Sequence, residues 1–144
     1  MRIKAIIISL KGTSLTKKEK SLLTQEKPWG VILFDRNLKS INQIKQLTST
    51  IKNLTRNKTF PIMIDEEGGT VTRLKKIINH NLSANFFGNL YRNNKNFCLK
   101  IYKLYLLSIC DILKDLGINI NTIPVLDIVR HNTNKIIGNR SFSN

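Results

Sequence analysis

The sequence is poor in cysteine, in acidic side chains and in long apolar runs. Its two cysteines, Cys98 and Cys110, lie inside an apolar helical pattern, form no CxxC motif and have no histidine cluster beside them. This arrangement argues against a zinc-binding module or a disulfide-dense scaffold. We predict that both cysteines are buried thiols of a protein from a reducing compartment.

No apolar run is long enough to cross a membrane. The N-terminal run, which follows Met1-Arg2-Ile3-Lys4, stops at residue 10, and the longest apolar segment, residues 97–116, is interrupted by five charged side chains. A signal-peptide core or a membrane span needs a longer uninterrupted stretch. We therefore predict a cytoplasmic protein that makes no contact with membranes.

Acidic residues number only 9, against 24 lysines and arginines, which gives a formal net charge of +15. Such a charge can attract nucleic acid, anionic membranes or acidic ligands. The sequence is also rich in Lys, Asn and Ile, which A/T-rich codons favour, and its positive charges are scattered. We interpret the charge as compositional and keep nucleic-acid binding as the less favoured alternative.

Four short apolar runs have the length and composition of strands in a parallel sheet. They cover residues 5–10, 30–34, 59–65 and 118–125. The first run is almost continuously β-branched, which predicts burial on both faces.

Helical patterns separate these runs. Thr16 with Glu19 and Ser40 with Gln43 have the spacing of capping boxes, so we predict helices that begin at residues 17 and 41. A third helix is predicted over residues 96–116, with Gly117 as its cap. The Asn- and Lys-rich region 75–96 is predicted to be a solvated loop.

The alternation of strands and helices is typical of a parallel sheet covered by helices. A barrel and a doubly wound sheet both fit it. No GxGxxG follows the first strand and no GxxxxGK[ST] occurs anywhere, which weakens the case for a nucleotide-binding open sheet.

Charged side chains follow three of the predicted strands, at Asp35, at 65–69 and at Asp127. Loops at the carboxyl ends of parallel strands share one opening, where such folds bind their ligands. The glycine pair within 65–69 would let the backbone turn closely past a ligand. Arg73 and Arg140 follow later, and either arginine alone would be read as a surface residue.

Four ordered stretches resemble glycoside hydrolase family 3, and in particular the bacterial β-N-acetylhexosaminidases of cell-wall recycling. They are 30–37 (GVILFDRN), 64–73 (IDEEGGTVTR), 117–127 (GININTIPVLD) and 137–142 (IGNRSF). The resemblance covers essentially the whole chain.

The resemblance implies an α/β fold, the first half of a TIM (β/α)8 barrel with about four βα units, so that residues 1–144 form a partial N-terminal domain of the family. It also implies hydrolysis of terminal β-linked N-acetylglucosamine from peptidoglycan fragments by a retaining mechanism, with no metal and no organic cofactor. By the same resemblance, Asp65, Arg73 and Arg140 bind the hydroxyls of the terminal sugar, a role that suits a carboxylate and two guanidiniums. Asp127 is expected to be structural.

The chain departs from the family pattern in two substitutions. Thr70 stands where many relatives carry arginine. Glu66 stands where glutamine is frequent, although both glutamate and glutamine occur there in the family.

A larger departure concerns catalysis. The family's Lys-His-Phe-Pro-Gly-His motif is absent, so the proton-transferring histidine and the nucleophilic aspartate are expected beyond Asn144. His80 and His131 lie in polar, Asn-rich surroundings, so we expect neither of them to replace the proton-transferring histidine. We expect the complete protein to be a longer enzyme, whose barrel is completed by a C-terminal half or by a second chain. The alternative is a non-catalytic remnant or sugar-binding module.

Overall fold

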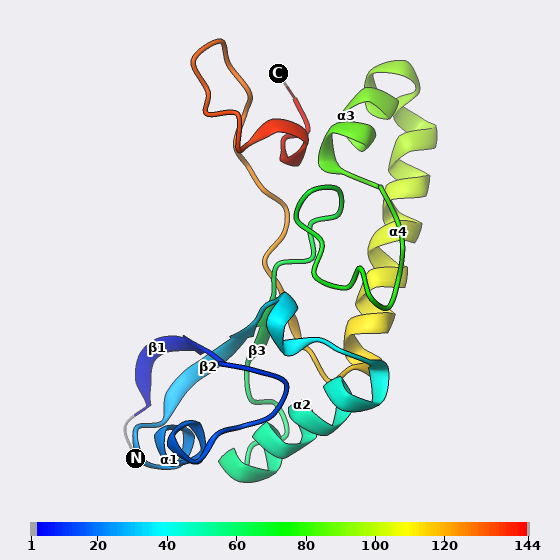
Figure 1. The fold of residues 1–144 in the computed structure, drawn as a ribbon. Coiled ribbons are helices and arrows are strands. Elements are labelled where there is room, and N and C mark those ends of the chain that lie inside the picture. Colours follow the sequence, from blue (N-terminus) through cyan, green and yellow to red (C-terminus); the bar gives the residue numbers. More distant parts are fainter. Residues whose placement is uncertain (1–2, 144) are drawn as a thin grey trace.

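The computed structural model describes residues 3–143 and contains one four-stranded parallel sheet (Figure 1). Its strands, in spatial order, are β1 (Lys4–Ser9), β2 (Pro28–Leu33), β3 (Ile62–Ile64) and β4 (Ile120–Asn121). Each strand pairs with the next one along the chain. The expectations that concern Met1, Arg2 and the chain beyond Asn144 lie outside the described residues.

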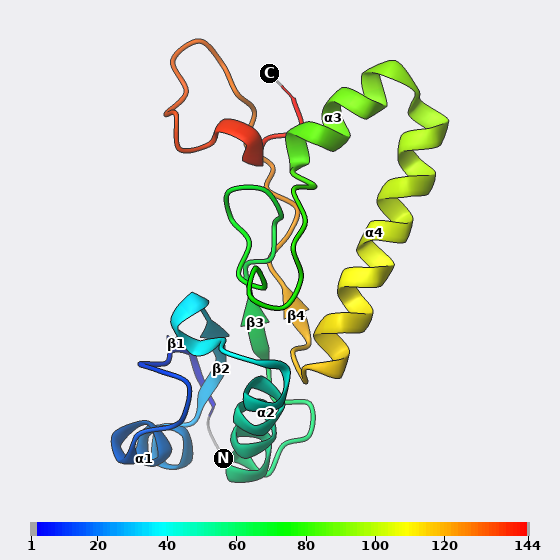
Figure 2. The same cartoon turned by 45° about the vertical axis from the view of Figure 1, so that its right-hand side comes forward.

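Four helices accompany the sheet, with two short 3-10 turns. They are α1 (Lys17–Gln25), η1 (Asp35–Asn37), α2 (Ile41–Thr55), α3 (Ala84–Asn93), α4 (Lys95–Asp115) and η2 (Gly138–Arg140). In Figure 2, α1 and α2 flank the lower part of the molecule, whereas α3 and most of α4 rise beyond the carboxyl ends of the strands. The loop after β3 and the C-terminal segment rise on the same side, so the polar loops of the chain gather above the sheet.

The starts of the first two helices confirm the predicted caps. The Thr16 hydroxyl accepts a hydrogen bond from the Glu19 amide at 3.2 Å, and the Glu19 carboxylate accepts one from the Thr16 amide at 2.7 Å. Ser40 caps α2 through the Gln43 amide at 3.3 Å. In a complete capping box the Gln43 side chain would accept from the amide of Ser40. Here it accepts from the amide of Lys39 instead.

The core lies between the sheet, α2 and the C-terminal part of α4. Its members on the strands include Val31, Leu33 and Ile62, which are all 0% exposed. Burying a side chain of this size contributes about 1.5–3 kcal/mol. The strands thus sit on a continuous apolar layer that fixes the loops at their ends.

The prediction that the first strand is buried on both faces is wrong. Ile6 and Ile7 of β1 are 46% and 44% exposed, and only Ile8 packs against the core. The reason is topological, since β1 is an edge strand that pairs with β2 alone. An apolar run predicts a strand, but it does not say how many neighbours the strand has.

The last two strands are shorter than predicted. The amide of Thr122 donates to the carbonyl of Ile64 at 3.0 Å, and Ile64 is the final residue of β3. Within the described chain, β3 therefore offers no further residue with which residues 123–125 could pair. On the amino side, Asn57 accepts from the amide and the hydroxyl of Thr59, which holds that segment in a turn and not in β3.

The region 75–96 is not a simple solvated loop, because it contains α3. The Ser83 hydroxyl caps this helix by accepting from the Phe86 amide at 3.2 Å. Phe87 is buried against Tyr102 and Tyr105 of α4, with ring centroids 4.7 and 5.2 Å away. Tertiary packing of a few aromatic residues therefore orders a stretch whose composition indicated a loop.

The two cysteines differ in exposure. Cys98 is buried, as predicted, and its thiol donates to the carbonyl of Phe87 at 3.3 Å. Cys110 is exposed, which contradicts the prediction, because it lies on the outer side of α4. Within residues 3–143, no helix is both long and apolar enough to span a membrane.

Candidate functional site

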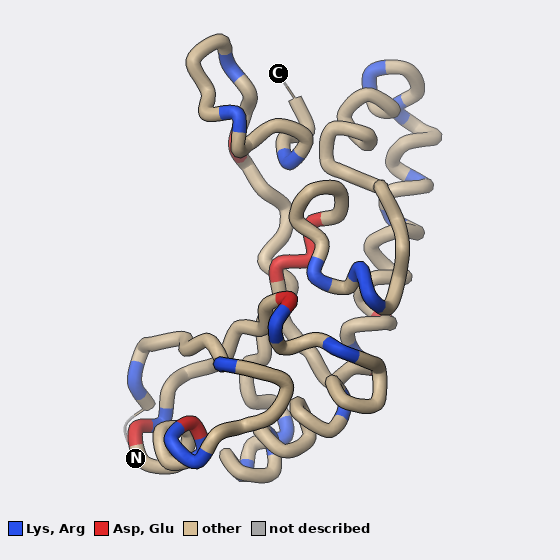
Figure 3. Tube along the Cα trace, in the orientation of Figure 1, with Lys and Arg blue, Asp and Glu red and all other residues tan. Residues whose placement is uncertain are grey.

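Acidic side chains gather where the strands end. Four of the nine acidic residues of the sequence follow β2 or β3: Asp35, Asp65, Glu66 and Glu67. Figure 3 shows these positions together at mid-height, with basic positions beside them. The carboxyl ends of the parallel strands therefore carry a compact charged cluster, as the sequence predicted.

Asp65 and Arg73 meet within this cluster. Nη2 of Arg73 lies 3.4 Å from Oδ2 of Asp65, while Oδ1 of Asp65 accepts from the Thr122 hydroxyl at 2.6 Å. The side chains of Asp65 and Arg73 are 23% and 24% exposed, so both are reachable from solvent. The structure thus brings together two of the three residues predicted to bind sugar.

Arg73 also faces the end of β2. Its Nη1 lies 4.0 Å from Oδ1 of Asp35, and its guanidinium lies over the ring of Phe34, 5.5 Å from the centroid. Among the described residues, neither Nε of Arg73 nor Oδ1 of Asp35 has a hydrogen-bond partner, although both atoms are buried. Such orphaned groups need a partner, and the hydroxyls of a ligand can provide it.

Arg140, the third predicted residue, contacts a different acid. Its Nε and Nη2 donate to the two carboxylate oxygens of Glu67 at 2.8 and 2.9 Å. These hydrogen bonds hold the pKa of the Arg140 guanidinium above its ordinary value, and the charges of Glu67, Asp127 and Asp65 add to the effect while burial opposes it. Arg140 thus lies within the electrostatic reach of Asp65 but is not paired with it.

Glu66 has a buried position in the cluster that the sequence did not reveal. Its side chain is fully buried and accepts hydrogen bonds from the hydroxyl of Thr72 and from the amides of Arg73 and Leu74. Three adjacent acids, Asp65 to Glu67, therefore contact three different basic side chains: Arg73, His80 and Arg140. A run of acids beside a glycine pair was the available signal, but it does not reveal which acid points inward.

His80 is also less exposed than its Asn-rich sequence suggests. Its side chain is 14% exposed, its Nε2 lies 3.3 Å from Oε1 of Glu66, and its ring packs edge-on against Tyr105 at 5.5 Å. Burial raises the pKa of Tyr105 to about 12, helped by the charge of Glu66 and by Tyr102. His80 therefore belongs to the interior behind the site, and no local pattern links it to Glu66.

The glycine pair serves close packing of the chain itself. Gly68 and Gly69 have φ values of 81° and 63°. A Cβ on Gly68 would lie 2.2 Å from the carbonyl oxygen of Leu82, and one on Gly69 would lie 2.7 Å from Cβ of Ser83. These glycines allow the loop to pass close to the start of α3. The expected close approach of this loop to a ligand stays a prediction.

Asp127 does not end a strand, because β4 stops at Asn121. Its backbone carbonyl accepts from the hydroxyl of Ser141 at 2.7 Å, which joins the two sides of the C-terminal segment. This contact uses the backbone of Asp127 and not its carboxylate, so the structural role of the side chain stays a prediction.

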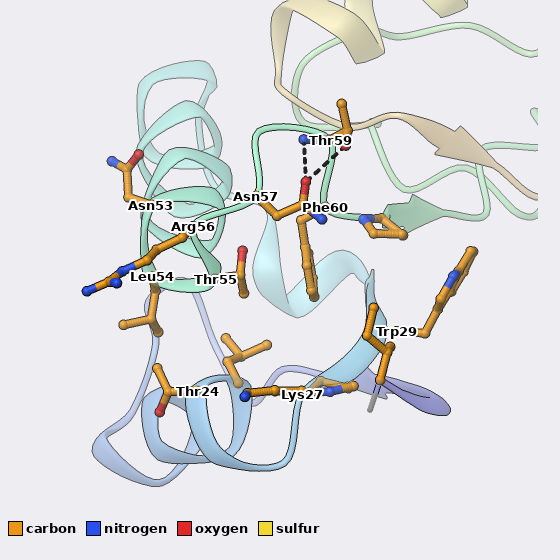
Figure 4. A pocket seen from close by; sticks show the side chains of 14 residues that line it. Thr24, Lys27, Trp29, Asn53, Leu54, Thr55, Arg56, Asn57, Thr59 and Phe60 are labelled. Carbon is orange, nitrogen blue, oxygen red and sulfur yellow. Dashed lines mark hydrogen bonds between the residues drawn. The ribbon is translucent and has the colours of Figure 1, made fainter. Parts of the chain in front are cut away.

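A large cavity lies at the opposite end of the sheet. It has a volume of about 920 Å³ and is lined by the amino ends of the strands and the C-terminal parts of α1 and α2 (Figure 4). Lys27 and Arg56 line it together with apolar side chains such as Phe60, and none of the described residues around it carries a carboxylate. Paired acids and bases occur at the carboxyl ends of the strands, so the candidate site is there. Residues 3–143 contain no group of three His, Cys, Asp or Glu side chains that could hold a metal ion.

A parallel sheet with helices outside and a charged cluster at the carboxyl ends of its strands is the arrangement of a barrel-type α/β domain. The family model for the glycosyl hydrolase family 3 N terminal domain matches residues 3–144. The chain therefore belongs to glycosyl hydrolase family 3.

Individual relatives agree with this assignment. A protein named Beta-hexosaminidase from Thioalkalivibrio sulfidiphilus is 32% identical over 99% of this chain, which spans 40% of the relative's length. The crystal structure of native NagZ from Neisseria gonorrhoeae is 29% identical, with a TM-score of 0.89 over 98% of this chain and 41% of that one. NagZ from the same organism in complex with N-trifluoroacetyl-D-glucosamine matches with a TM-score of 0.88 and 29% identity over 98% of this chain and 40% of that one. The predicted α/β fold is confirmed, because the four-stranded parallel sheet with its helices matches the N-terminal part of a TIM-barrel-like fold. Among the described residues, three of the four strands are followed by an α-helix and β4 is not.

Proposed function

We propose that this chain is the sugar-binding part of a β-N-acetylhexosaminidase, which releases terminal β-linked N-acetylglucosamine from cell-wall fragments. The observation that carries the proposal is the Asp65–Arg73 pair at the carboxyl ends of the strands, with Arg140 nearby. The chain spans 40% of the relative described above. We therefore propose that residues 1–144 are part of a longer family domain.

The chemistry of the site suits a sugar. A hydroxyl group both donates and accepts, so it can pair with an acidic acceptor and a guanidinium donor at once. The contact of Arg73 with Asp65 is loose at 3.4 Å, and the unpartnered Nε of Arg73 and Oδ1 of Asp35 lie beside it. Hydroxyls that enter here would satisfy these groups and shorten the charge-assisted bonds.

We propose that catalysis requires groups other than Asp65, Arg73 and Arg140. The family resemblance implies a retaining mechanism, in which an aspartate forms a covalent glycosyl-enzyme that water then hydrolyses. We propose that this aspartate and the proton-transferring histidine belong to the longer protein, beyond Asn144. Asp65, Arg73 and Arg140 would hold the terminal sugar while those groups act on it. We propose cytoplasmic action on the same resemblance.

A titration of N-acetylglucosamine into the 144-residue chain tests the binding step. We expect saturable binding at millimolar sugar in calorimetry and its loss in Asp65→Ala. Asp115→Ala is the matched control, because Asp115 pairs with Lys45 on the surface and lies before the amino end of β4, away from the carboxyl ends of the strands. If the wild-type chain binds no sugar at millimolar concentration, or if both variants lose binding equally, the proposed site is wrong.

Two alternatives give different results. A non-catalytic sugar-binding module would bind the sugar, but its native protein would not cleave chromogenic β-N-acetylglucosaminides. A nucleic-acid-binding protein would retard nucleic acid at low salt and release it steeply as salt rises. Figure 3 shows lysine and arginine positions spread over many segments of the chain and not gathered in one, which favours the sugar site over a polyanion surface.

A further inference from the structure

Glu66 occupies an unusual place for a carboxylate. Its side chain is 0% exposed, and its Oε2 accepts from the amides of Arg73 and Leu74 at 2.7 and 2.8 Å. Its Oε1 accepts from the hydroxyl of Thr72. An ionised carboxylate is costly to bury unless it is paired and hydrogen-bonded, and here three successive residues of one loop supply those bonds.

The backbone of Glu66 is also fixed. Its amide donates to Oδ1 of Asn121 at 3.0 Å, and Nδ2 of Asn121 donates back to the carbonyl of Glu66 at 3.1 Å. Asn121 belongs to β4, so these two bonds tie Glu66 to the sheet. The backbone of Glu66 is therefore held by β4, and its carboxylate in turn holds residues 72–74.

Asp65 and Glu66 hold opposite ends of the same arginine. Glu66 binds the backbone amide of Arg73, and Asp65 faces its guanidinium at 3.4 Å. We propose that Glu66 is a positioning residue for sugar binding, which sets the backbone of Arg73 so that its guanidinium reaches Asp65 and the ligand. This inference rests on the proposed function, because it concerns the same site.

The geometry predicts which substitutions preserve this role. In Glu66→Gln, the amide oxygen can replace Oε2 and accept from both backbone amides, while the amide nitrogen can donate to the hydroxyl oxygen of Thr72. In Glu66→Ala both acceptors disappear, and two buried N–H groups lose their partners. Glu66→Asp keeps the charge but withdraws the acceptors by about 1.5 Å, the length of one carbon–carbon bond.

The experiment uses the 144-residue chain with 15N-labelled arginine. The order of the Arg73 Nε–Hε group is measured by heteronuclear NOE, and N-acetylglucosamine affinity is measured by titration. Arg140 is an internal control, because Glu67 and not Glu66 holds its guanidinium. A merely structural role of Glu66 would change the two arginines alike.

We expect Glu66→Ala and Glu66→Asp to disorder Arg73, to leave Arg140 ordered and to weaken sugar binding roughly tenfold or more, which equals the loss of about one charge-assisted hydrogen bond. Glu66→Gln should keep both properties close to wild type. If Glu66→Ala does not fold, Glu66→Asp and Glu66→Gln still give opposite predictions.

An ordered Arg73 with unchanged affinity in Glu66→Asp would overturn the inference, and so would a disordered Arg73 in Glu66→Gln. Failure of the wild-type chain to bind sugar would instead refute the proposed function. The NMR comparison of Arg73 with Arg140 would still report on positioning in that case, so the two failures are distinguishable.

Discussion

The Glu67–Arg140 pair should contribute more to stability than the exposed ion pairs of this protein. It joins the end of β3 to the C-terminal segment through two hydrogen bonds of 2.8 and 2.9 Å. The side chains of Glu67 and Arg140 are 9% and 24% exposed. Removing Glu67 by substitution with alanine leaves a guanidinium partly buried without its acceptor.

The size of the effect follows from this geometry. Hydrogen bonds to charged groups contribute about 1.5–3 kcal/mol each, and partial exposure of Arg140 reduces that figure. We therefore expect Glu67→Ala to lower the free energy of unfolding by about 2 kcal/mol and Tm by roughly 6–8 °C. Glu67→Gln keeps one acceptor oxygen and should lower the free energy of unfolding by about half as much.

Thermal unfolding followed by circular dichroism measures these differences. The control is Asp115→Ala, which breaks the Lys45–Asp115 pair, whose side chains are 42% and 65% exposed. An exposed pair is worth about 0.2–1 kcal/mol, so this variant should change Tm by only a few degrees. Equal losses in Glu67→Ala and Asp115→Ala would refute the reasoning, because burial and bidentate geometry would then add nothing.

Two further predictions concern other parts of the fold. Gly88→Ala would place a Cβ 1.7 Å from the carbonyl oxygen of Phe142, so we expect a loss of about 1–3 kcal/mol in urea unfolding; unchanged stability would contradict the observed packing of α3. The pKa of Glu19 lies below its ordinary value of 4.5, because hydrogen bonds from Thr16 and Lys11 outweigh burial, which alone would raise it. The carboxylate therefore adds stability that is complete above pH 4.5 and is lost as the pH falls through the lower folded value, and Glu19→Gln should flatten the dependence of Tm on pH in that range; superimposable curves for the two proteins would count against it.

Local rules predicted the features that depend on neighbouring residues. The Thr16–Glu19 capping box and the apolar runs of β2 and β3 specify their elements within a few residues. The position of Asp65 at the end of an apolar run predicted its place at the carboxyl edge of the sheet, where the charged cluster lies. Such signals are short-ranged, and the sequence displays them directly.

Features that depend on distant contacts could not be predicted in this way. The burial of β1 depends on how many strands flank it, and α3 depends on Phe87 packing against α4. The surroundings of Glu66 depend on His80, fourteen positions away, and on Asn121 in another strand. Each of these requires knowledge of which segments meet in space.

The three successive acids at the end of β3 have a consequence for how this region can change over evolutionary time. Each carboxylate from Asp65 to Glu67 contacts a different basic side chain: Arg73 and His80 lie in the connection between β3 and α3, and Arg140 lies in the C-terminal segment. Deleting or inserting one residue here would shift every acid to its neighbour's partner at once. The segment can therefore accept exchanges of one side chain for another, such as glutamine for Glu66, but its length is fixed by three independent contacts.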